Sequence, residues 1–334
     1  MVPLLEFRSV ERTYPSRQGP LHVLRDIGFT LEQGDILALV GESGCGKTTT
    51  GKIAAGLVAP SGGQVLFKGE DITTLRGEAL TRFRRSVQLI HQDPYSSLNP
   101  VRTVLQTLAA PLRRFRLVKS RSELLDKVRE LLLMVDLTPP DDFLFKYPHQ
   151  LSGGQRQRMA VARALTVGPE FIVADESVSM VDVSIRTGLL NMLLKLNQKL
   201  GVAFLFITHD VAVARYFSWR GRTAVMYLGR IVEYGSTPAV TRNPTHPYTG
   251  ALVSSLPVAN PRLARERARD DEIGSPDVPS LHNLPPGCAF HPRCPLSAVG
   301  SCDRDVPELA AISEQESEHQ VACPVVLAAN REVG

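Results

Sequence analysis

The stretch GESGCGKTTT, residues 41–50, constrains the fold more than any other part of the sequence. Residues 41–48 match the pattern G-x-x-x-x-G-K-[ST], whose glycines allow successive backbone N–H groups to point into one concave anion site. The apolar run DILALV precedes the pattern, and a segment with helical spacing follows it. This strand–loop–helix context predicts a phosphate-binding loop in a nucleotide-binding core.

The loop supplies a set of candidate nucleotide ligands. Lys47 is expected to reach the β- and γ-phosphates of ATP, and Thr48 is expected to bind Mg²⁺. The helix that starts near Gly46 adds its positive end. The predicted nucleotide-binding residues of this loop are Gly41, Glu42, Ser43, Gly44, Cys45, Gly46, Lys47, Thr48 and Thr49.

An acidic pair ends another apolar run, FIVADES. We expect Asp175 to hold Mg²⁺ through water, and Glu176 to polarise the water that attacks the γ-phosphate. His209 follows the run AFLFIT, and Gln92 follows VQLI. His209 is predicted to contact the γ-phosphate, and Gln92 is predicted to bind Mg²⁺ and the water.

A second group of small residues, LSGGQ, opens a helix about a hundred residues after the first loop. Its backbone N–H groups and the Ser152 hydroxyl form another anion site. One nucleotide cannot use both sites of a compact monomer if they lie on different subdomains. We therefore expect two chains to pair head to tail around ATP. The residues that each chain would offer to the ATP of the other are Leu151, Ser152, Gly153, Gly154, Gln155 and Asp182.

Strand-like runs alternate with helical patterns, and the stretch from about 103 to 165 is mostly helical. This alternation predicts an α/β fold with a mainly parallel sheet and a separate helical subdomain. We expect a nucleotide-binding domain over 1–257, with the helical subdomain at about 93–167. A linker rich in proline and charge should span 258–287, and a cysteine-containing extension should span 288–334.

The bulk composition limits the classes of partner. The chain has 334 residues, 43% of them apolar, and a formal net charge of +4. A continuous apolar run of about 18 residues is absent, so we expect no membrane-spanning helix, and the N-terminus does not have the pattern of a signal peptide. The basic runs RFRR and RRFRLVKSR are not accompanied by a stripe of aromatic residues, so nucleic-acid binding is not expected.

Taken in order, these motifs resemble the ATP-binding cassette (ABC) family over about residues 4–257. The resemblance implies a RecA-like P-loop core with an antiparallel β subdomain and a helical subdomain. It makes 151–155 the signature motif, Asp182 the D-loop residue and His209 the switch histidine. It also implies that Tyr14, in VERTYPS, stacks on adenine.

A closer resemblance, to the ATPase subunits of dipeptide and oligopeptide importers, rests on QDPYSSLNP, YPHQLSGGQRQRMAVARAL, NPTHPYTGALVSSLP and PPGCAFHPRCP. It implies a peripheral ATPase on the cytoplasmic side of the cell membrane, bound to two permease subunits and served by an extracytoplasmic peptide-binding protein. The second ATPase is another chain or a second copy. The segment 95–110 lies where the family docks its permease.

Other functions remain as alternatives. Related importers of nickel, glutathione or antimicrobial peptides use similar ATPases. A soluble ABC ATPase of DNA repair or translation and a catalytically silent cassette are less favoured, because the chain has one cassette and keeps Lys47, Glu176 and His209.

The sequence departs from the family after the acidic pair, where the usual run is Pro-Thr-Ser-Ala-Leu-Asp. Here Ser177-Val178-Ser179-Met180-Val181 precedes Asp182. Loss of the proline relaxes the backbone just past Glu176. We hypothesise that catalysis survives and that coupling across the dimer is altered.

Four cysteines fall in the last fifty residues, with the spacing C-x5-C-x7-C-x20-C: Cys288, Cys294, Cys302 and Cys323. Four thiolates in a loop-rich segment suggest a metal site, and chemistry alone favours zinc or leaves free thiols. The resemblance to peptide importers suggests a [4Fe–4S] cluster in this region. We hypothesise that it has a structural role and pins the tail against the partner ATPase. His291 is expected to be a loop residue.

Overall fold

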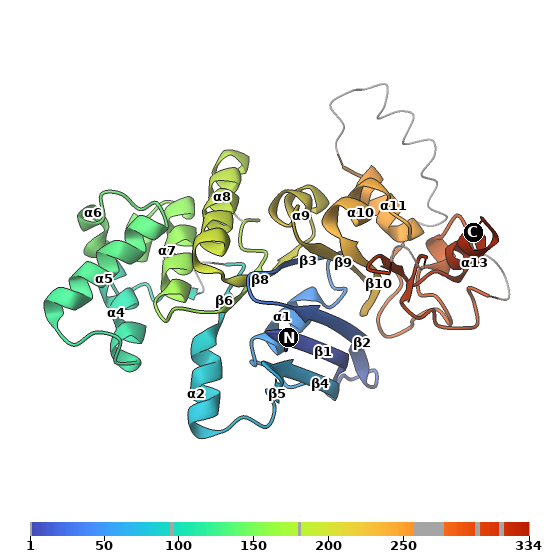
Figure 1. Cartoon of the computed structure of the whole chain (residues 1–334), viewed down its shortest axis with the longest axis horizontal. Coiled ribbons are helices and arrows are strands. Elements are labelled where there is room, and N and C mark those ends of the chain that lie inside the picture. The colour runs from blue at the N-terminus through green and yellow to red at the C-terminus, as the bar shows by residue number, and fades with distance from the viewer. Residues whose placement is uncertain are drawn as a thin grey trace.

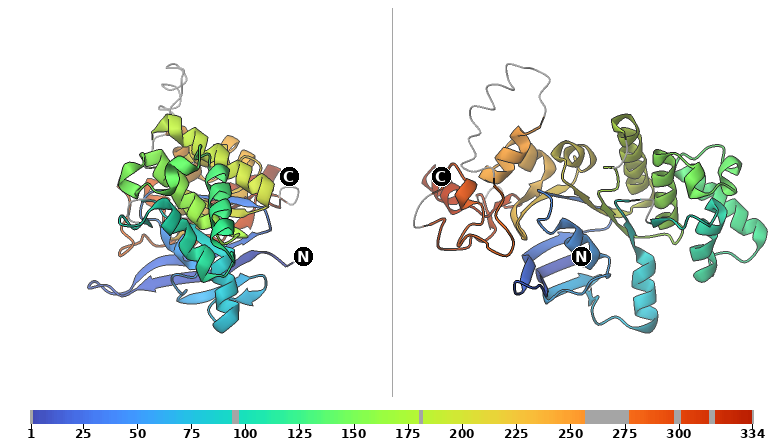
Figure 2. Two further views of the ribbon diagram at one scale, coloured as in Figure 1. Left: turned by 90° about the vertical axis from the view of Figure 1, so that its left-hand side faces the viewer. Right: turned by 180° about the vertical axis from the view of Figure 1, so that it is seen from behind.

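The computed structural model describes residues 2–93, 97–179, 182–256, 277–297, 301–313 and 317–333. In Figure 1 a group of helices lies at one end of the molecule, the C-terminal residues lie at the other, and two β-sheets lie between them. The views in Figure 2 show the same arrangement from the side and from behind. The predicted α/β class is confirmed.

The larger sheet has eight strands in the order β11-β12-β10-β9-β3-β8-β7-β6. The strands from β9 to β6 are parallel, and β10, β12 and β11 continue the sheet in antiparallel fashion. Strands buried on both faces are continuously apolar, as the runs at β3, β7 and β8 are. The bounds are β3 Ile36–Val40, β6 Val87–Ile90, β7 Phe171–Asp175, β8 Ala203–Thr208, β9 Arg222–Tyr227, β10 Arg230–Ser236, β11 Ala310–Ala311 and β12 Gln320–Val321.

The smaller sheet is antiparallel, with strand order β2-β1-β4-β5. It packs beside helix α1 below the larger sheet in Figure 1. Its strands are β1 Leu5–Tyr14, β2 Leu21–Leu31, β4 Gly62–Phe67 and β5 Glu70–Asp71.

The helical subdomain is built from capped helices between β6 and β7. Thr103 and Gln106 form a capping box that starts α4, and Ser152 and Gln155 form one that starts α7, which satisfies backbone groups that a helix end leaves without partners. Its elements are α4 Val104–Arg114, α5 Arg121–Met134, α6 Asp141–Leu144, the 3₁₀ turn Pro148–Gln150 and α7 Gly153–Leu165.

The remaining helices connect strands or cover the sheet. They are α1 Lys47–Ala54, α2 Gly77–Ser86, α8 Val183–Leu200, α9 Val211–Phe217, α10 Thr237–Arg242, α11 Pro247–Ser254, the 3₁₀ turn His291–Arg293 and α13 Pro324–Val333.

Side chains of the central strands alternate between two hydrophobic cores. Ile172 and Phe204 belong to the core that contains Met159 of α7. Val173 belongs to the core that contains Ile53 of α1 and the smaller sheet. Because neighbouring residues of a strand point to opposite faces, α1 and α7 cover opposite faces of the larger sheet.

A buried carboxylate joins the C-terminal residues to this sheet. Glu233 of β10 is 0% exposed, and its oxygens lie 2.8 Å from Nε2 of His319 and accept the backbone N–H groups of Thr245 and His246, each at 2.9 Å. Strand β12 pairs with β10 next to this contact. The tail therefore extends the sheet of the core. Most of the predicted linker 258–287 lies outside the described residues, and the domain limits stay a prediction.

Candidate functional site

The phosphate loop turns tightly between β3 and α1, as predicted. Gly41 has φ 155° and Gly46 has φ 109°. A Cβ at Gly41 would overlap the carbonyl oxygen of Met226, and one at Gly46 would lie 2.7 Å from Cδ2 of Leu24. Glycine is required at both positions, because any side chain would push the loop away from the sheet edge.

Lys47 lies inside this loop, with 5% of its surface exposed. Its ammonium donates to the carbonyl oxygens of Gly41 at 2.7 Å and Glu42 at 2.8 Å. The loop thus carries a buried cation beside the positive end of α1, which is the charge that a polyphosphate requires.

Thr48 and Asp175 meet across the sheet edge. The Thr48 hydroxyl lies 3.3 Å from Oδ1 of Asp175. Burial raises the pKa of the Asp175 carboxyl, the bond from Thr48 lowers it, and the nearby Glu176 carboxylate raises it further. A hydroxyl and a carboxylate side by side are oxygen donors of the kind that Mg²⁺ prefers.

Glu176 is the centre of the hydrogen-bond network at this edge. Its Oε2 accepts from Nε2 of Gln92 at 2.7 Å, and its Oε1 lies 3.0 Å from Nδ1 of His209. Because a carboxylate only accepts, Nδ1 of His209 carries the proton in this contact. Residues from the ends of β6, β7 and β8 are therefore joined through one carboxylate.

The backbone of Glu176 is also unusual, with φ 45°. Non-glycine residues seldom adopt this left-handed region, and where they do it is often at a functional site. The conformation is held because the Glu176 N–H donates to the Ile207 carbonyl at 2.9 Å, and its own carbonyl accepts from the Ser179 hydroxyl at 2.8 Å.

The remaining predicted nucleotide residues lie apart from this cluster. Ser152 is exposed at the start of α7, on the face of the sheet opposite α1. Asp182 is exposed before α8, and Met180 and Val181 next to it lie outside the described residues. Tyr14 ends β1, and the Arg12 guanidinium lies 4.4 Å from the centre of its ring.

Two residues at this site were missed by the sequence reasoning. The Tyr248 hydroxyl accepts the backbone N–H of Glu42 at 2.9 Å. Arg293 donates from two nitrogens to the two carboxylate oxygens of Glu42, each at 3.1 Å. Both residues occur in the quoted stretches NPTHPYTGALVSSLP and PPGCAFHPRCP, but nothing in those letters shows that they reach a loop some two hundred residues earlier.

The four tail cysteines also gather in one place, as free thiols. Burial raises the pKa of the Cys294 thiol to about 11, and the neighbouring thiols Cys323, Cys288 and Cys302 raise it as well. Burial and the neighbouring thiols likewise raise the pKa of Cys288 and Cys323.

Nearby backbone N–H groups lower the pKa of three of these thiols against this trend, although burial outweighs them: those of Phe290 and His291 for Cys288, that of Leu296 for Cys294, and those of Val325 and Val326 for Cys323. Hydrogen bonds of this kind favour a thiolate. Nevertheless, within the described part of the chain no set of three or more His, Cys, Asp or Glu side chains is arranged to hold a single metal ion.

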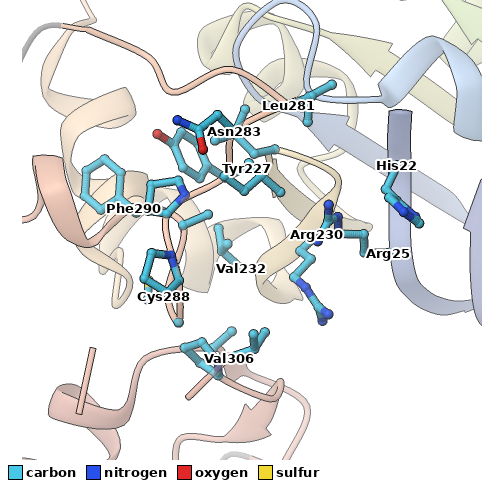
Figure 3. Close-up of a pocket in the computed structure, with 18 of the residues that line it drawn as sticks. His22, Arg25, Tyr227, Arg230, Val232, Leu281, Asn283, Cys288, Phe290 and Val306 are labelled. Atoms are coloured by element: carbon cyan, nitrogen blue, oxygen red, sulfur yellow. The ribbon is translucent and has the colours of Figure 1, made fainter. Parts of the chain in front are cut away.

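A cavity of about 400 Å³ lies between β2, the β9–β10 turn and the tail segment 281–290 (Figure 3). Arg25 and Arg230 lie on one side of it, and Tyr227 and Phe290 lie on the other. Its lining residues do not include the predicted nucleotide ligands. The residues predicted to bind the nucleotide therefore lie outside this cavity.

Comparison with known proteins agrees with the geometry. The ABC transporter family matches residues 24–179, and the family described as the C-terminal region of oligopeptide/dipeptide transporters matches residues 232–302. A probable peptide ABC transporter ATP-binding protein of Sinorhizobium fredii is 42% identical over 329 residues, 96% of this chain and 90% of that protein. An oligopeptide transport ATP-binding protein of Bacillus subtilis is 42% identical over 328 residues, 96% of each chain.

Solved structures share the fold. A dimeric ATP-binding cassette in a post-hydrolysis state, bound to ADP and phosphate, matches with a TM-score of 0.63 at 29% identity, over 70% of this chain and 98% of that one. A subunit of a Clostridium perfringens ABC transporter complex, cbiO1, matches with a TM-score of 0.65 at 22% identity, over 80% of this chain and 100% of that one. The second likeness supports the fold alone.

Replacing Lys47 with alanine is expected to weaken ATP binding about 100-fold, because a charge-assisted contact to phosphate contributes about 3 kcal/mol. The control is Lys52→Ala, which removes an exposed ammonium from the same helix. Titration with the fluorescent analogue mant-ATP measures both. Equal affinities for the two variants would contradict the assignment of Lys47.

Proposed function

Because this chain belongs to the ATP-binding cassette family, among the ATP-binding proteins of peptide transporters, we propose that it hydrolyses ATP to drive import of di- and oligopeptides across the cytoplasmic membrane. The observation that carries the proposal is the contact of the Glu176 carboxylate with both Gln92 and His209, at the sheet edge that holds the phosphate loop. Relatives named for peptides favour this substrate over nickel or glutathione.

The site supports a simple hydrolytic step. Water attacks the γ-phosphorus, and the bond from that phosphorus to the β–γ bridging oxygen breaks, so ADP and phosphate leave. Glu176 accepts the proton of the attacking water. Its two hydrogen bonds to Gln92 and His209 keep the carboxylate oriented, and Lys47 offsets the charge of the phosphates. This division of roles is consistent with catalysis by fixed charges and donors.

The residues at the end of the phosphate loop, at the end of β7 and just after β6 can bind magnesium. Thr48, Asp175 and Gln92 would hold it, and the first two already place their oxygens 3.3 Å apart. When bound, Mg²⁺ supplies positive charge to the β- and γ-phosphates.

The opposite placement of α1 and α7 supports a dimer with two shared sites. Lys47 of each chain would bind that chain's own nucleotide. Ser152 and Asp182 of the same chain would bind the nucleotide of the partner. ATP then joins the two chains, and loss of the γ-phosphate releases them. The partner is a second copy or a related ATPase.

In the described part of the chain, helices long and apolar enough to cross a bilayer are absent. We propose that the chain attaches peripherally, on the cytoplasmic side, to two permease subunits. The segment 95–110 would contact them, although its first two residues lie outside the described part. An extracytoplasmic binding protein would deliver the peptide.

The departure after Glu176 supports altered coupling within this scheme. Ser177 is 2% exposed, and its hydroxyl has no hydrogen-bond partner among the described residues. Val178 beside it is 4% exposed. We propose that this run still positions Glu176, and that it changes how Asp182 responds to the partner chain.

Glu176→Gln is expected to lower the hydrolysis rate about 100-fold or more, because the amide cannot accept the proton of water. ATP should then hold the variant as a stable dimer, which size-exclusion chromatography detects. Glu170→Gln, just before the other end of β7, is the control and should hydrolyse ATP normally. Normal phosphate release by Glu176→Gln would refute its role.

The transport proposal predicts that vesicles containing the whole transporter accumulate a labelled oligopeptide when ATP is supplied on the cytoplasmic face. The Glu176→Gln variant should abolish this uptake, because access changes with hydrolysis. Mass spectrometry of the ligand captured with the permease and binding protein identifies the cargo. Recovery of nickel or glutathione in place of peptides would overturn the peptide assignment.

We also propose that Cys288, Cys294, Cys302 and Cys323 hold a [4Fe–4S] cluster, with zinc as the alternative. The four thiols lie close enough together to raise one another's pKa, which supports ligation as a group. A bound metal would offset the burial that now favours the protonated thiols. The four cysteines would be its ligands, and four thiolates are a ligand set that both iron–sulfur clusters and structural zinc sites use. When bound, the cluster would cross-link three segments of the tail.

Protein purified without oxygen is expected to be brown, with absorbance at about 400 nm and about four irons per chain. Cys302→Ser should lose the colour, whereas Cys45→Ala, which removes the thiol of the phosphate loop, should keep it. Iron and zinc analysis is the measurement. Colourless protein with one zinc, or with no metal, would contradict the cluster.

A further inference from the structure

The C-terminal tail places a charged group directly on the phosphate loop. Arg293 is 5% exposed, and its two terminal nitrogens each lie 3.1 Å from an oxygen of Glu42, the second residue of that loop. A planar guanidinium that meets a carboxylate through two parallel bonds fixes its orientation as well as its charge. The two residues are 251 positions apart in the sequence.

Aromatic packing fixes the position of Arg293 itself. Phe290, three residues earlier, is 1% exposed, and its ring centre lies 5.4 Å from that of Tyr227 and 5.4 Å from that of Tyr248. The Arg293 guanidinium lies 5.6 Å from the Phe290 ring centre and 3.3 Å from the Tyr227 hydroxyl. Figure 3 shows Tyr227 and Phe290 side by side on the wall of the cavity. A packed wall therefore supports the guanidinium.

Glu42 transmits this support to the nucleotide ligand Lys47. The Glu42 carbonyl accepts from the Lys47 ammonium at 2.8 Å, and the Glu42 N–H donates to the Tyr248 hydroxyl at 2.9 Å. The side chain of Glu42 is bound to Arg293, so every polar group of this residue is engaged. The peptide that holds Lys47 is thus oriented by residues from the C-terminal part of the chain.

Arg293 also compensates the negative charge of Glu42. The Glu42 carboxylate lies in a loop that is expected to hold several phosphate charges, so without a partner it would repel them. Arg293 neutralises it and turns it towards the tail. Because the guanidinium is buried and the carboxylate is only partly exposed, removal of Arg293 leaves the charge of Glu42 without a close counter-charge.

We propose that Arg293 is a positioning residue of the nucleotide site, which holds Glu42 so that the phosphate loop accepts ATP. The inference rests on the proposed ATP-binding role of residues 41–48. On this proposal the tail contributes to nucleotide binding, and this contribution does not depend on a metal at the cysteines.

The test uses the full chain and mant-ATP as the probe. Arg293→Met should raise the Kd about tenfold, because the unpaired carboxylate repels phosphate. In the assembled transporter the KM for ATP should rise while kcat changes little. Arg304→Met, which removes an exposed arginine of the same tail, is the matched control and should bind normally.

Two further variants separate positioning from general loss of structure. Adding Glu42→Gln to Arg293→Met should recover most of the affinity, because the repelling charge is gone. Arg293→Lys should give an intermediate Kd, and it tests the inference if Arg293→Met folds poorly. A lower Tm with an unchanged Kd would show a structural role only and would overturn the proposal, as would failure of Glu42→Gln to restore affinity.

The outcomes distinguish this inference from the function on which it rests. Failure of the wild-type chain to bind mant-ATP would overturn the proposed function, and this inference with it. Tight wild-type binding that Arg293→Met leaves unchanged would overturn this inference alone.

Discussion

Parallel hydrogen bonding among β3, β8, β7 and β6 is the constraint on which the rest of the structure depends. Val40 pairs with Thr208, Ile207 with Asp175, and Ala174 with Ile90, so the four strands end nearly level with one another. The chain leaves all of them at one edge. Polar residues that are far apart in the sequence therefore meet there because the strands that precede them are paired. Burial of the apolar strands stabilises the arrangement.

Much of this edge could be predicted, because each of its residues directly follows an apolar run that reads as a strand. The phosphate loop, Asp175, Glu176 and His209 were found in this way, and the structure brings them together. Strands β11 and β12 were not predicted, because two residues each are too short to show a period. The contact between Arg293 and Glu42 also leaves no local trace, because the two residues are 251 positions apart. Pairing between distant segments depends on the completed fold.

The backbone at Glu176 is another feature that the letters do not reveal. A left-handed conformation at a glutamate is unfavourable by about 1–3 kcal/mol, and it persists only where the surroundings impose it. Here the Ile207 carbonyl and the Ser179 hydroxyl do so. Because the chain turns sharply at this residue, the carboxylate points along the sheet edge towards Gln92 and His209. The two hydrogen bonds that hold the left-handed backbone of Glu176 therefore also help to orient its carboxylate.

The buried carboxylate of Glu233 limits how far the chain can be shortened from its C-terminus. A fragment that stops before His319 would lack the imidazole that meets this charge and the strand that covers the edge of β10. Only the backbone N–H groups of Thr245 and His246 would then offset an anion in a dry interior. Strand β10 borders β9, which borders the strand that leads into the phosphate loop. Removal of the tail is therefore expected to destabilise β10, at the antiparallel side of the sheet that carries the phosphate loop.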